Sequence, residues 1–224
     1  MSVQLDRPRS AVHNVAIPPL GLAGLLTLPH EATGIVAFVH GSGSSRLSPR
    51  NTYVAQSFND AGFATLLFDL LTAREETNRQ NVFDIPLLAE RLIGAVQWVM
   101  SDPRSAHLPL GLFGASTGAA AALVAAACLD RKVRAVVSRG GRADLADAAL
   151  PEVEAPTLLI VGGDDTQVLA LNRSALARMH CTKTLKVVPG ATHLFEEPGT
   201  LDIVVAEASE WFKEHLTAER LAQG

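Results

Sequence analysis

One serine of this sequence is placed where it could act as a nucleophile. Ser116 is the centre of Gly-Ala-Ser-Thr-Gly, which follows the apolar run Leu108–Phe113 and begins the alanine-rich stretch Thr117–Leu129. A G-x-S-x-G sequence between a strand and a helix is typical of a tight turn that projects the serine hydroxyl from the end of a sheet. The helix start would place backbone N–H groups beside the serine, where negative charge develops during acyl transfer. The alternative is a glycine-rich turn in which Ser116 only caps the helix.

Two later loops carry residues that could assist this serine. Gly-Gly-Asp-Asp follows one predicted strand and supplies Asp164 and Asp165, and Pro-Gly-Ala-Thr-His follows the last predicted strand and ends in His193. Open α/β sheets place their site residues just beyond the carboxyl ends of strands. The order serine, aspartate, histidine along the chain is also one that catalytic triads use. The sequence therefore predicts Ser116 as nucleophile and His193 as base, with Asp165 or Asp164 as the acid.

A fourth loop could stabilise the negative charge. The predicted strand Ile35–Val39 leads into His-Gly-Ser-Gly-Ser at residues 40–44. The glycines keep side chains out of the way, and the N–H of Ser42, paired with that of Thr117, could donate to an oxyanion. An anion-binding nest is the alternative interpretation of this loop. A nucleotide P-loop is not expected, because the pattern G-x-x-x-x-G-K-[ST] is missing.

Short apolar runs alternate with longer stretches of helical spacing, which predicts an α/β fold. Because the strands are continuous apolar runs, we expect a mostly parallel, doubly wound sheet that is covered on both faces. Pro18, Pro19 and Gly21 join the first two runs and predict an antiparallel hairpin. No linker divides the chain, so residues 1–224 are predicted to form one domain. The predicted strands are Val12–Ile17, Leu22–Leu28, Ile35–Val39, Ala64–Leu70, Leu108–Phe113, Val133–Val137, Thr157–Val161 and Thr184–Val188, and the predicted helices are Thr52–Ala61, Ile85–Met100, Thr117–Leu129, Val168–Met179 and Leu201–Leu216.

The composition narrows the class of protein further. Apolar residues make up 48% of the chain and the net charge is only −4, which argues against disorder and against a nucleic-acid partner. No apolar run is long enough to span a bilayer and the first residues resemble no secretory signal, so a cytoplasmic location is expected. The seven histidines lack metal-ligand spacing, and neither a metal nor a cofactor is predicted. Cys128, in its alanine-rich stretch, is predicted to be a small buried hydrophobe.

Five segments together resemble the α/β-hydrolase superfamily and, within it, the dienelactone-hydrolase-like branch. They read FVHGSGSS, GFATLLFDLLT, GLFGASTGAA, LLIVGGDD and VVPGATHLFEEPG, and in this order they cover nearly the whole chain. The resemblance implies a hydrolase with a nucleophile–histidine–acid triad, and the family pattern G-x-x-D, from Gly162 to Asp165, favours Asp165 as the acid. Dienelactone hydrolases carry cysteine where this chain has Ser116, which favours a general serine esterase. In some relatives this domain is fused to a phosphoribosyltransferase, for which 224 residues leave no room.

The residues and the resemblance together predict a serine hydrolase. It would cleave small carboxylic esters, lactones or thioesters through an acyl-enzyme on Ser116. A non-catalytic ligand-binding protein of the same fold is one alternative. A nicotinamide-dependent oxidoreductase is another, which the absence of G-x-G-x-x-G after the first strand disfavours.

Two arginines near the predicted catalytic edge could contact the substrate. Arg139 and Arg142 follow the strand Val133–Val137, and the stretch before the next strand leaves room for one small helix and no lid. The pocket is therefore expected to be open, and these arginines could pair with a substrate carboxylate. The alternative interpretation is that at least one of them forms a structural ion pair.

Overall fold

The computed structural model describes residues 10–216, and its eight strands form one sheet in the order β1-β2-β4-β3-β5-β6-β7-β8. The first two pairings along this order are antiparallel: β1 with β2, and β2 with β4. Strand β4 then pairs parallel with β3. All remaining neighbours are parallel. The mostly parallel sheet and its antiparallel N-terminal hairpin confirm the sequence prediction. The strands are β1 (Ala11–Ile17), β2 (Leu22–Leu28), β3 (Gly34–Val39), β4 (Phe63–Phe68), β5 (Leu110–Ala115), β6 (Val133–Arg139), β7 (Thr157–Gly162) and β8 (Lys183–Val188).

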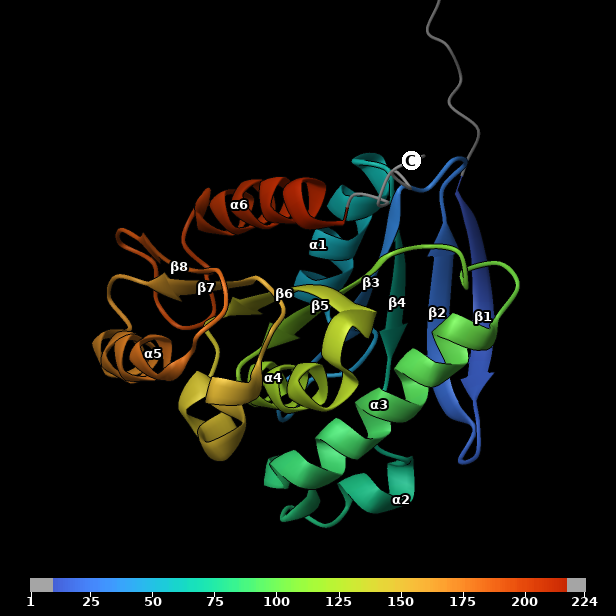
Figure 1. Ribbon diagram of the computed structural model, residues 1–224, viewed down its shortest axis with the longest axis horizontal. Helices are drawn as coiled ribbons and strands as arrows, with labels where there is room; N and C mark the ends of the chain where they lie inside the picture. The colour runs from blue at the N-terminus through green and yellow to red at the C-terminus, as the bar shows by residue number, and fades with distance from the viewer. Residues whose placement is uncertain (1–9, 217–224) are drawn as a thin grey trace, which may run out of the picture.

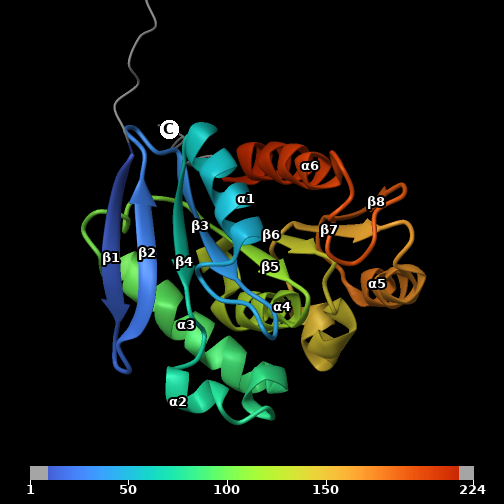
Figure 2. The ribbon, with the colours of Figure 1, turned by 180° about the vertical axis from the view of Figure 1, so that it is seen from behind.

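Helices cover both faces of this sheet (Figures 1 and 2). Helices α1 and α6 pack against each other on one face, and α3, α4 and α5 lie on the other. No separate cap domain stands over the sheet in residues 10–216, as predicted. The helices are α1 (Pro49–Asp60), α2 (Ala73–Glu76), α3 (Ile85–Ser101), α4 (Thr117–Leu129), α5 (Thr166–Arg178) and α6 (Thr200–His215), and the 3₁₀ segments are η1 (Asn81–Phe83), η2 (Asp130–Lys132) and η3 (Ala143–Glu152).

The two faces of the sheet have cores of different character. Strands β3, β4, β5 and β7 are buried along their whole length, as their continuous apolar runs predict. Under α1 and α6 the core is aromatic: the ring of Phe58 lies 5.6 Å from that of Phe113 and 5.5 Å from that of Phe212. Under α3 and α4 it is built from leucine, valine and alanine. Because both faces of the sheet are packed, the ends of the strands are held in place, and so are the starting points of the loops that follow them.

Helix α4 packs closely against the sheet because most of its side chains are small, chiefly alanine. A Cβ atom added to Gly118 would lie 2.1 Å from the carbonyl oxygen of Val39, and one added to Gly114 would lie 2.5 Å from Cα of Ala119. Neither position could hold a larger residue without pushing the helix away from β3 and β5. The two glycines that flank the serine therefore serve the close strand–helix crossing that the sequence predicts.

Two features of the fold differ from the sequence prediction or add to it. Cys128 is exposed at the end of α4, so the prediction that it is a buried hydrophobe is wrong. The segment that contains α2 and η1 was not predicted, because its polar sequence shows no helical apolar pattern. Within residues 10–216, every helix is too short or too polar to cross a lipid bilayer.

Candidate active site

Ser116 occupies the strained turn that a nucleophile of this kind requires. Its backbone angles are φ 51° and ψ −123°, a region that residues with a side chain rarely adopt. Two backbone hydrogen bonds hold it there: its N–H donates to the carbonyl of Arg139 at 3.3 Å, and its carbonyl accepts from the N–H of Arg142 at 3.0 Å. The side chain makes no capping hydrogen bond to α4. Ser116 therefore sits at the start of the helix with its hydroxyl unused by the cap.

The structure brings His193 and Asp165 together from two different loops. Nδ1 of His193 lies 2.6 Å from Oδ2 of Asp165. This contact orients the imidazole, since the carboxylate accepts a hydrogen bond from the Nδ1–H group and leaves Nε2 directed away from it. Asp164 is exposed, and its backbone N–H donates to the carbonyl of Ala191. Of the two aspartates that the motif offers, the structure therefore pairs Asp165 with the histidine.

The loop that carries His193 is held by a carboxylate that the sequence reasoning did not single out. Glu197 accepts hydrogen bonds from the backbone N–H of Thr192 at 3.1 Å and from its hydroxyl at 2.5 Å. These hydrogen bonds lower the pKa of Glu197 below its usual value. Phe195, at φ 54° and almost fully buried, anchors the same loop in the aromatic core. These contacts hold the loop that carries His193 in place.

The loop after β3 lies against the nucleophile turn. The backbone N–H of Ser42 donates to the hydroxyl oxygen of Thr117 at 3.1 Å. A Cβ atom added to Gly41 would lie 2.9 Å from Cβ of Ser116, so only glycine allows the loop to come this close. Ser42 and Thr117, the two predicted oxyanion donors, are therefore direct neighbours in the structure.

Two further side chains fix this loop to the end of β4. His40 is buried; its Nε2 accepts from the N–H of Leu70 at 3.2 Å, which leaves Nδ1 to donate to the carbonyl of Gly41 at 3.1 Å. Asp69 accepts from the backbone N–H of Arg46 at 2.8 Å and pairs with its guanidinium. The sequence shows His40 and Gly41 at the start of this loop, but its pattern does not predict the contacts of His40. It likewise does not predict that Asp69 pairs with Arg46.

Arg139 is a buried cation at the edge of the same site. It ends β6 directly beside Ala115, the residue before the nucleophile, and is only 8% exposed. Its Nη2 lies 3.5 Å from Oδ1 of Asn51, and its Nη1 has no partner among residues 10–216. Burial, together with the charge of Arg50, lowers the pKa of the Arg139 guanidinium to about 10. The group stays protonated at neutral pH, and no carboxylate of residues 10–216 forms an ion pair with it.

Arg142, the second arginine predicted at this edge, pairs with a carboxylate. Its guanidinium donates two hydrogen bonds to Asp144, at 2.9 Å and 2.8 Å. These bonds and the charge of Asp144 raise the pKa of Arg142. The side chain does not line the cavity around Ser116, so the structure does not bring Arg142 to the predicted substrate site. Its contacts are those of a structural ion pair.

A cavity of about 870 Å³ joins these elements at the carboxyl ends of the strands. Ser116, His193 and Arg139 line it together, with the loop of residues 41–45 on one side. The lining also contains two exposed apolar side chains, Leu47 and Leu194. The arrangement places a serine hydroxyl, a carboxylate-bound imidazole and backbone N–H donors around one space. That combination is suited to nucleophilic attack on a carbonyl carbon.

The segment between β4 and α3 forms a wall of this cavity that the sequence did not predict. Glu76 and Val82 line it from α2 and the stretch that follows. A capping box fixes α2, because Thr72 and Glu75 exchange hydrogen bonds through side chain and backbone. Glu75 also pairs with Arg91 of α3 at 2.9 Å. Residues between β4 and α3 therefore form part of the cavity lining, which the sequence did not predict.

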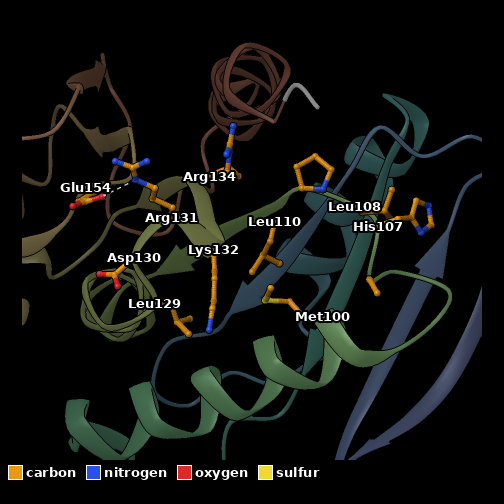
Figure 3. A pocket seen from close by; sticks show the side chains of 12 residues that line it. Met100, His107, Leu108, Leu110, Leu129, Asp130, Arg131, Lys132, Arg134 and Glu154 are labelled. Atoms are coloured by element: carbon orange, nitrogen blue, oxygen red, sulfur yellow. Dashed lines mark ion pairs between the residues drawn. The ribbon is translucent and has the colours of Figure 1, made fainter. Parts of the chain in front are cut away.

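A second cavity of about 840 Å³ lies at the opposite edge of the sheet, by the amino ends of β5 and β6. Figure 3 shows its cationic side chains, with Arg131 facing Glu154 at 3.8 Å. It contains no residue of the Ser116 site, and open α/β sheets bind ligands at the other ends of their strands. In residues 10–216 no cluster of three His, Cys, Asp or Glu side chains could hold a metal ion. The Ser116 cavity is the better candidate for chemistry.

Comparison with known proteins agrees with this fold. The sequence model of the Dienelactone hydrolase family matches residues 22–218. A dienelactone hydrolase structure from Anabaena variabilis is 55% identical, has a TM-score of 0.90, and the match covers 94% of this chain and 99% of that one.

More distant structures share the fold alone. Est1E from Butyrivibrio proteoclasticus has a TM-score of 0.76 at 15% identity, covering 92% of this chain and 99% of that one. A serine hydrolase without lid from Xanthomonas campestris has a TM-score of 0.73 at 21% identity, covering 94% of this chain and 96% of that one.

The curated relatives are longer proteins. Two from strains of Mycobacterium tuberculosis, each named "Putative phosphoribosyl transferase", are 61% identical over 202 residues, which is 90% of this chain and 46% of theirs. The chain therefore spans about half the length of the curated relatives that it matches. With the family model matching nearly the whole described structure and a 55% identical structure of the same fold, the chain belongs to the dienelactone hydrolase family.

Proposed function

We propose that this protein is a serine hydrolase that cleaves small carboxylic esters, lactones or thioesters through an acyl-enzyme on Ser116. The observation that carries the proposal is the 2.6 Å contact between His193 and Asp165 at a cavity that Ser116 also lines. A turn residue that serves only structure needs no oriented imidazole in the same cavity. Membership of the dienelactone hydrolase family supports hydrolysis as the class of reaction.

The proposed reaction has two halves. Oγ of Ser116 attacks the carbonyl carbon while Nε2 of His193 takes the hydroxyl proton, and the resulting imidazolium gives this proton to the leaving group. Water then attacks the acyl carbon while Nε2 of His193 takes one of its protons. The bond between this carbon and Oγ of Ser116 breaks, the imidazolium returns the proton to Oγ, and the carboxylic acid leaves. Asp165 stays ionised throughout and stabilises the imidazolium that forms in each half.

The developing oxyanion would be bound by the backbone N–H groups of Ser42 and Thr117. In the substrate-free structure the Ser42 amide donates to the Thr117 hydroxyl, so it is already directed at the residue that supplies the second donor. The carbonyl oxygen of the substrate would replace this hydroxyl as acceptor. Each such donor contributes about 3 kcal/mol of transition-state stabilisation in comparable sites.

Active-site labelling tests this assignment directly. A fluorophosphonate probe should modify Ser116, as mass spectrometry of the peptides would show, because the probe requires an activated serine. The same preparation should hydrolyse members of a panel of p-nitrophenyl esters, lactones and thioesters. A protein that neither reacts with the probe nor hydrolyses any of the panel would be a ligand-binding member of the fold instead. The curated relatives' name suggests a third reaction, phosphoribosyl transfer, but nothing in the Ser116 cavity favours it over hydrolysis.

The unbalanced charge of Arg139 supports an acidic group on the preferred substrate. Arg139 lines the same cavity as Ser116, so its guanidinium would be stabilised by a carboxylate bound beside the reacting carbonyl. We expect Arg139→Met to lower kcat/KM for an ester that carries a carboxylate by about 10- to 100-fold, since a hydrogen bond to a charged group contributes about 1.5 to 3 kcal/mol. For an uncharged ester of the same size the change should stay below about threefold.

A matched variant separates recognition by Arg139 from a general loss of positive charge near the site. Arg142→Met removes the neighbouring arginine, whose guanidinium is bound to Asp144, and should not change the ratio between the two esters. Equal losses on both esters in Arg139→Met would show that Arg139 supports the structure of the site and does not select the substrate.

A further inference from the structure

One short turn contacts both the nucleophile and the histidine. The turn from Arg139 to Arg142 bonds the backbone of Ser116 on both sides, through the carbonyl of Arg139 and the N–H of Arg142. Gly140, at φ 51°, packs against the histidine loop: a Cβ atom added to it would lie 2.9 Å from the carbonyl oxygen of His193 and 3.7 Å from Cε1 of the imidazole. A shift of this turn would therefore change the position of Ser116 relative to His193.

A buried side chain of α5 anchors the backbone of this turn. Asn172 of α5 is fully buried, and its Nδ2 donates to the carbonyl of Gly141 at 2.8 Å and to the carbonyl of Val168 at 2.8 Å. The first bond joins α5 to the turn, and the second fixes the amide within its own helix. Because both acceptors are carbonyl oxygens, the orientation of the amide is determined by its partners.

Helix α5 also carries the acid of the proposed triad. Asp165 is the residue directly before the helix, and Asn172 lies about two turns further along it. The helix thus holds the carboxylate that orients His193 at its start and the amide that anchors the nucleophile turn in its body. Gly141 has no room to adjust by itself, since a Cβ atom there would lie 2.0 Å from Oγ of Ser138 and 2.5 Å from Cβ of Ala119.

We propose that Asn172 is a positioning residue that sets the alignment of Ser116 with the His193–Asp165 pair. It does not touch the substrate cavity; it acts by tying the acid-bearing helix to the turn that holds the serine. The proposal rests on the serine hydrolase mechanism above and adds to it a residue outside the reacting groups.

The first test compares two buried asparagines of similar structural role. Asn59 of α1 is also buried, and its Nδ2 donates to the carbonyl of Phe63 at 2.9 Å and to the hydroxyl of Thr65 at 3.0 Å, at the opposite edge of the sheet. At a temperature where both variants are folded, Asn172→Ala should lower kcat for a p-nitrophenyl ester by about 10- to 100-fold with KM nearly unchanged, because small misplacements of reacting groups have effects of this size. Asn59→Ala should keep kcat within about twofold of the wild type.

The second test measures whether Asn172 acts through the triad. In an Asp165→Asn background the imidazole has lost its orienting carboxylate, so adding Asn172→Ala should lower kcat by less than about threefold. A purely structural role would give the same loss in both backgrounds. If Asn172→Ala does not fold, Asn172→Ser takes its place, because a serine hydroxyl can still bond the carbonyl of Val168 but is too short to reach Gly141.

The outcomes separate this inference from the proposed function. A kcat of Asn172→Ala equal to that of Asn59→Ala, or an undiminished loss in the Asp165→Asn background, would overturn the role of Asn172 alone. Absence of probe labelling at Ser116 in the wild type would overturn the hydrolase mechanism, and the role of Asn172 with it.

Discussion

Replacing Ser116 by alanine should lower kcat for ester hydrolysis by about 10⁵-fold or more, since removal of a triad serine has an effect of this order. In the proposed mechanism Oγ of Ser116 forms the acyl-enzyme, and the alanine variant has no oxygen at the strained turn to replace it. The fold should be almost unaffected, because the side chain makes no capping bond to α4 and the turn is held by backbone hydrogen bonds that alanine keeps. Steady-state rates and thermal unfolding measure the two effects side by side.

A control serine makes this result specific. Ser101, at the end of α3, is exposed and donates only to the carbonyl of Trp98, so Ser101→Ala should hydrolyse esters as the wild type does. Ser116→Ala that retained a tenth or more of the wild-type rate would contradict the assignment of the nucleophile.

Asp165→Asn should lower kcat by about 10⁴-fold, the size of effect seen when the acid of a triad is made neutral. An amide in this position would favour the wrong tautomer of His193, because its NH₂ group would face Nδ1 at the 2.6 Å contact. The imidazolium that forms during the reaction would also lose its balancing charge. Single-turnover rates with a p-nitrophenyl ester should show the loss in the acylation step.

The adjacent aspartate provides a matched control for this variant. Asp164 differs from Asp165 by one position and is exposed, with only its backbone N–H engaged. Asp164→Asn should therefore remain within about twofold of the wild-type kcat. A comparable loss in both variants would mean that the negative charge of the loop matters and the contact with His193 does not.

The positions of the site residues could be anticipated because topology determines them. Ser116, Asp165 and His193 each follow a strand, and parallel strands deliver their carboxyl ends to one edge of the sheet. The glycines around Ser116 were also informative, because the spacing reveals a close crossing of strand and helix. Such features depend on local sequence and on the order of elements, both of which a single sequence contains.

Contacts between distant polar side chains could not be anticipated in the same way. Arg139 and Arg142 are equivalent in sequence, yet Asp144 pairs with only one of them, and Asn172 finds the carbonyl of Gly141 across 31 positions. The alanine-rich helix gave no pattern to show which face meets water, so Cys128 was misplaced. These properties depend on packing in three dimensions, which periodicity does not encode.

The unbalanced guanidinium of Arg139 has a consequence for engineering. A buried charge without a counter-ion weakens the folded state, and an apolar side chain of similar volume often strengthens it. A search for heat-resistant variants that scored only the melting temperature would therefore select replacements at position 139, together with any loss of the substrate preference proposed above.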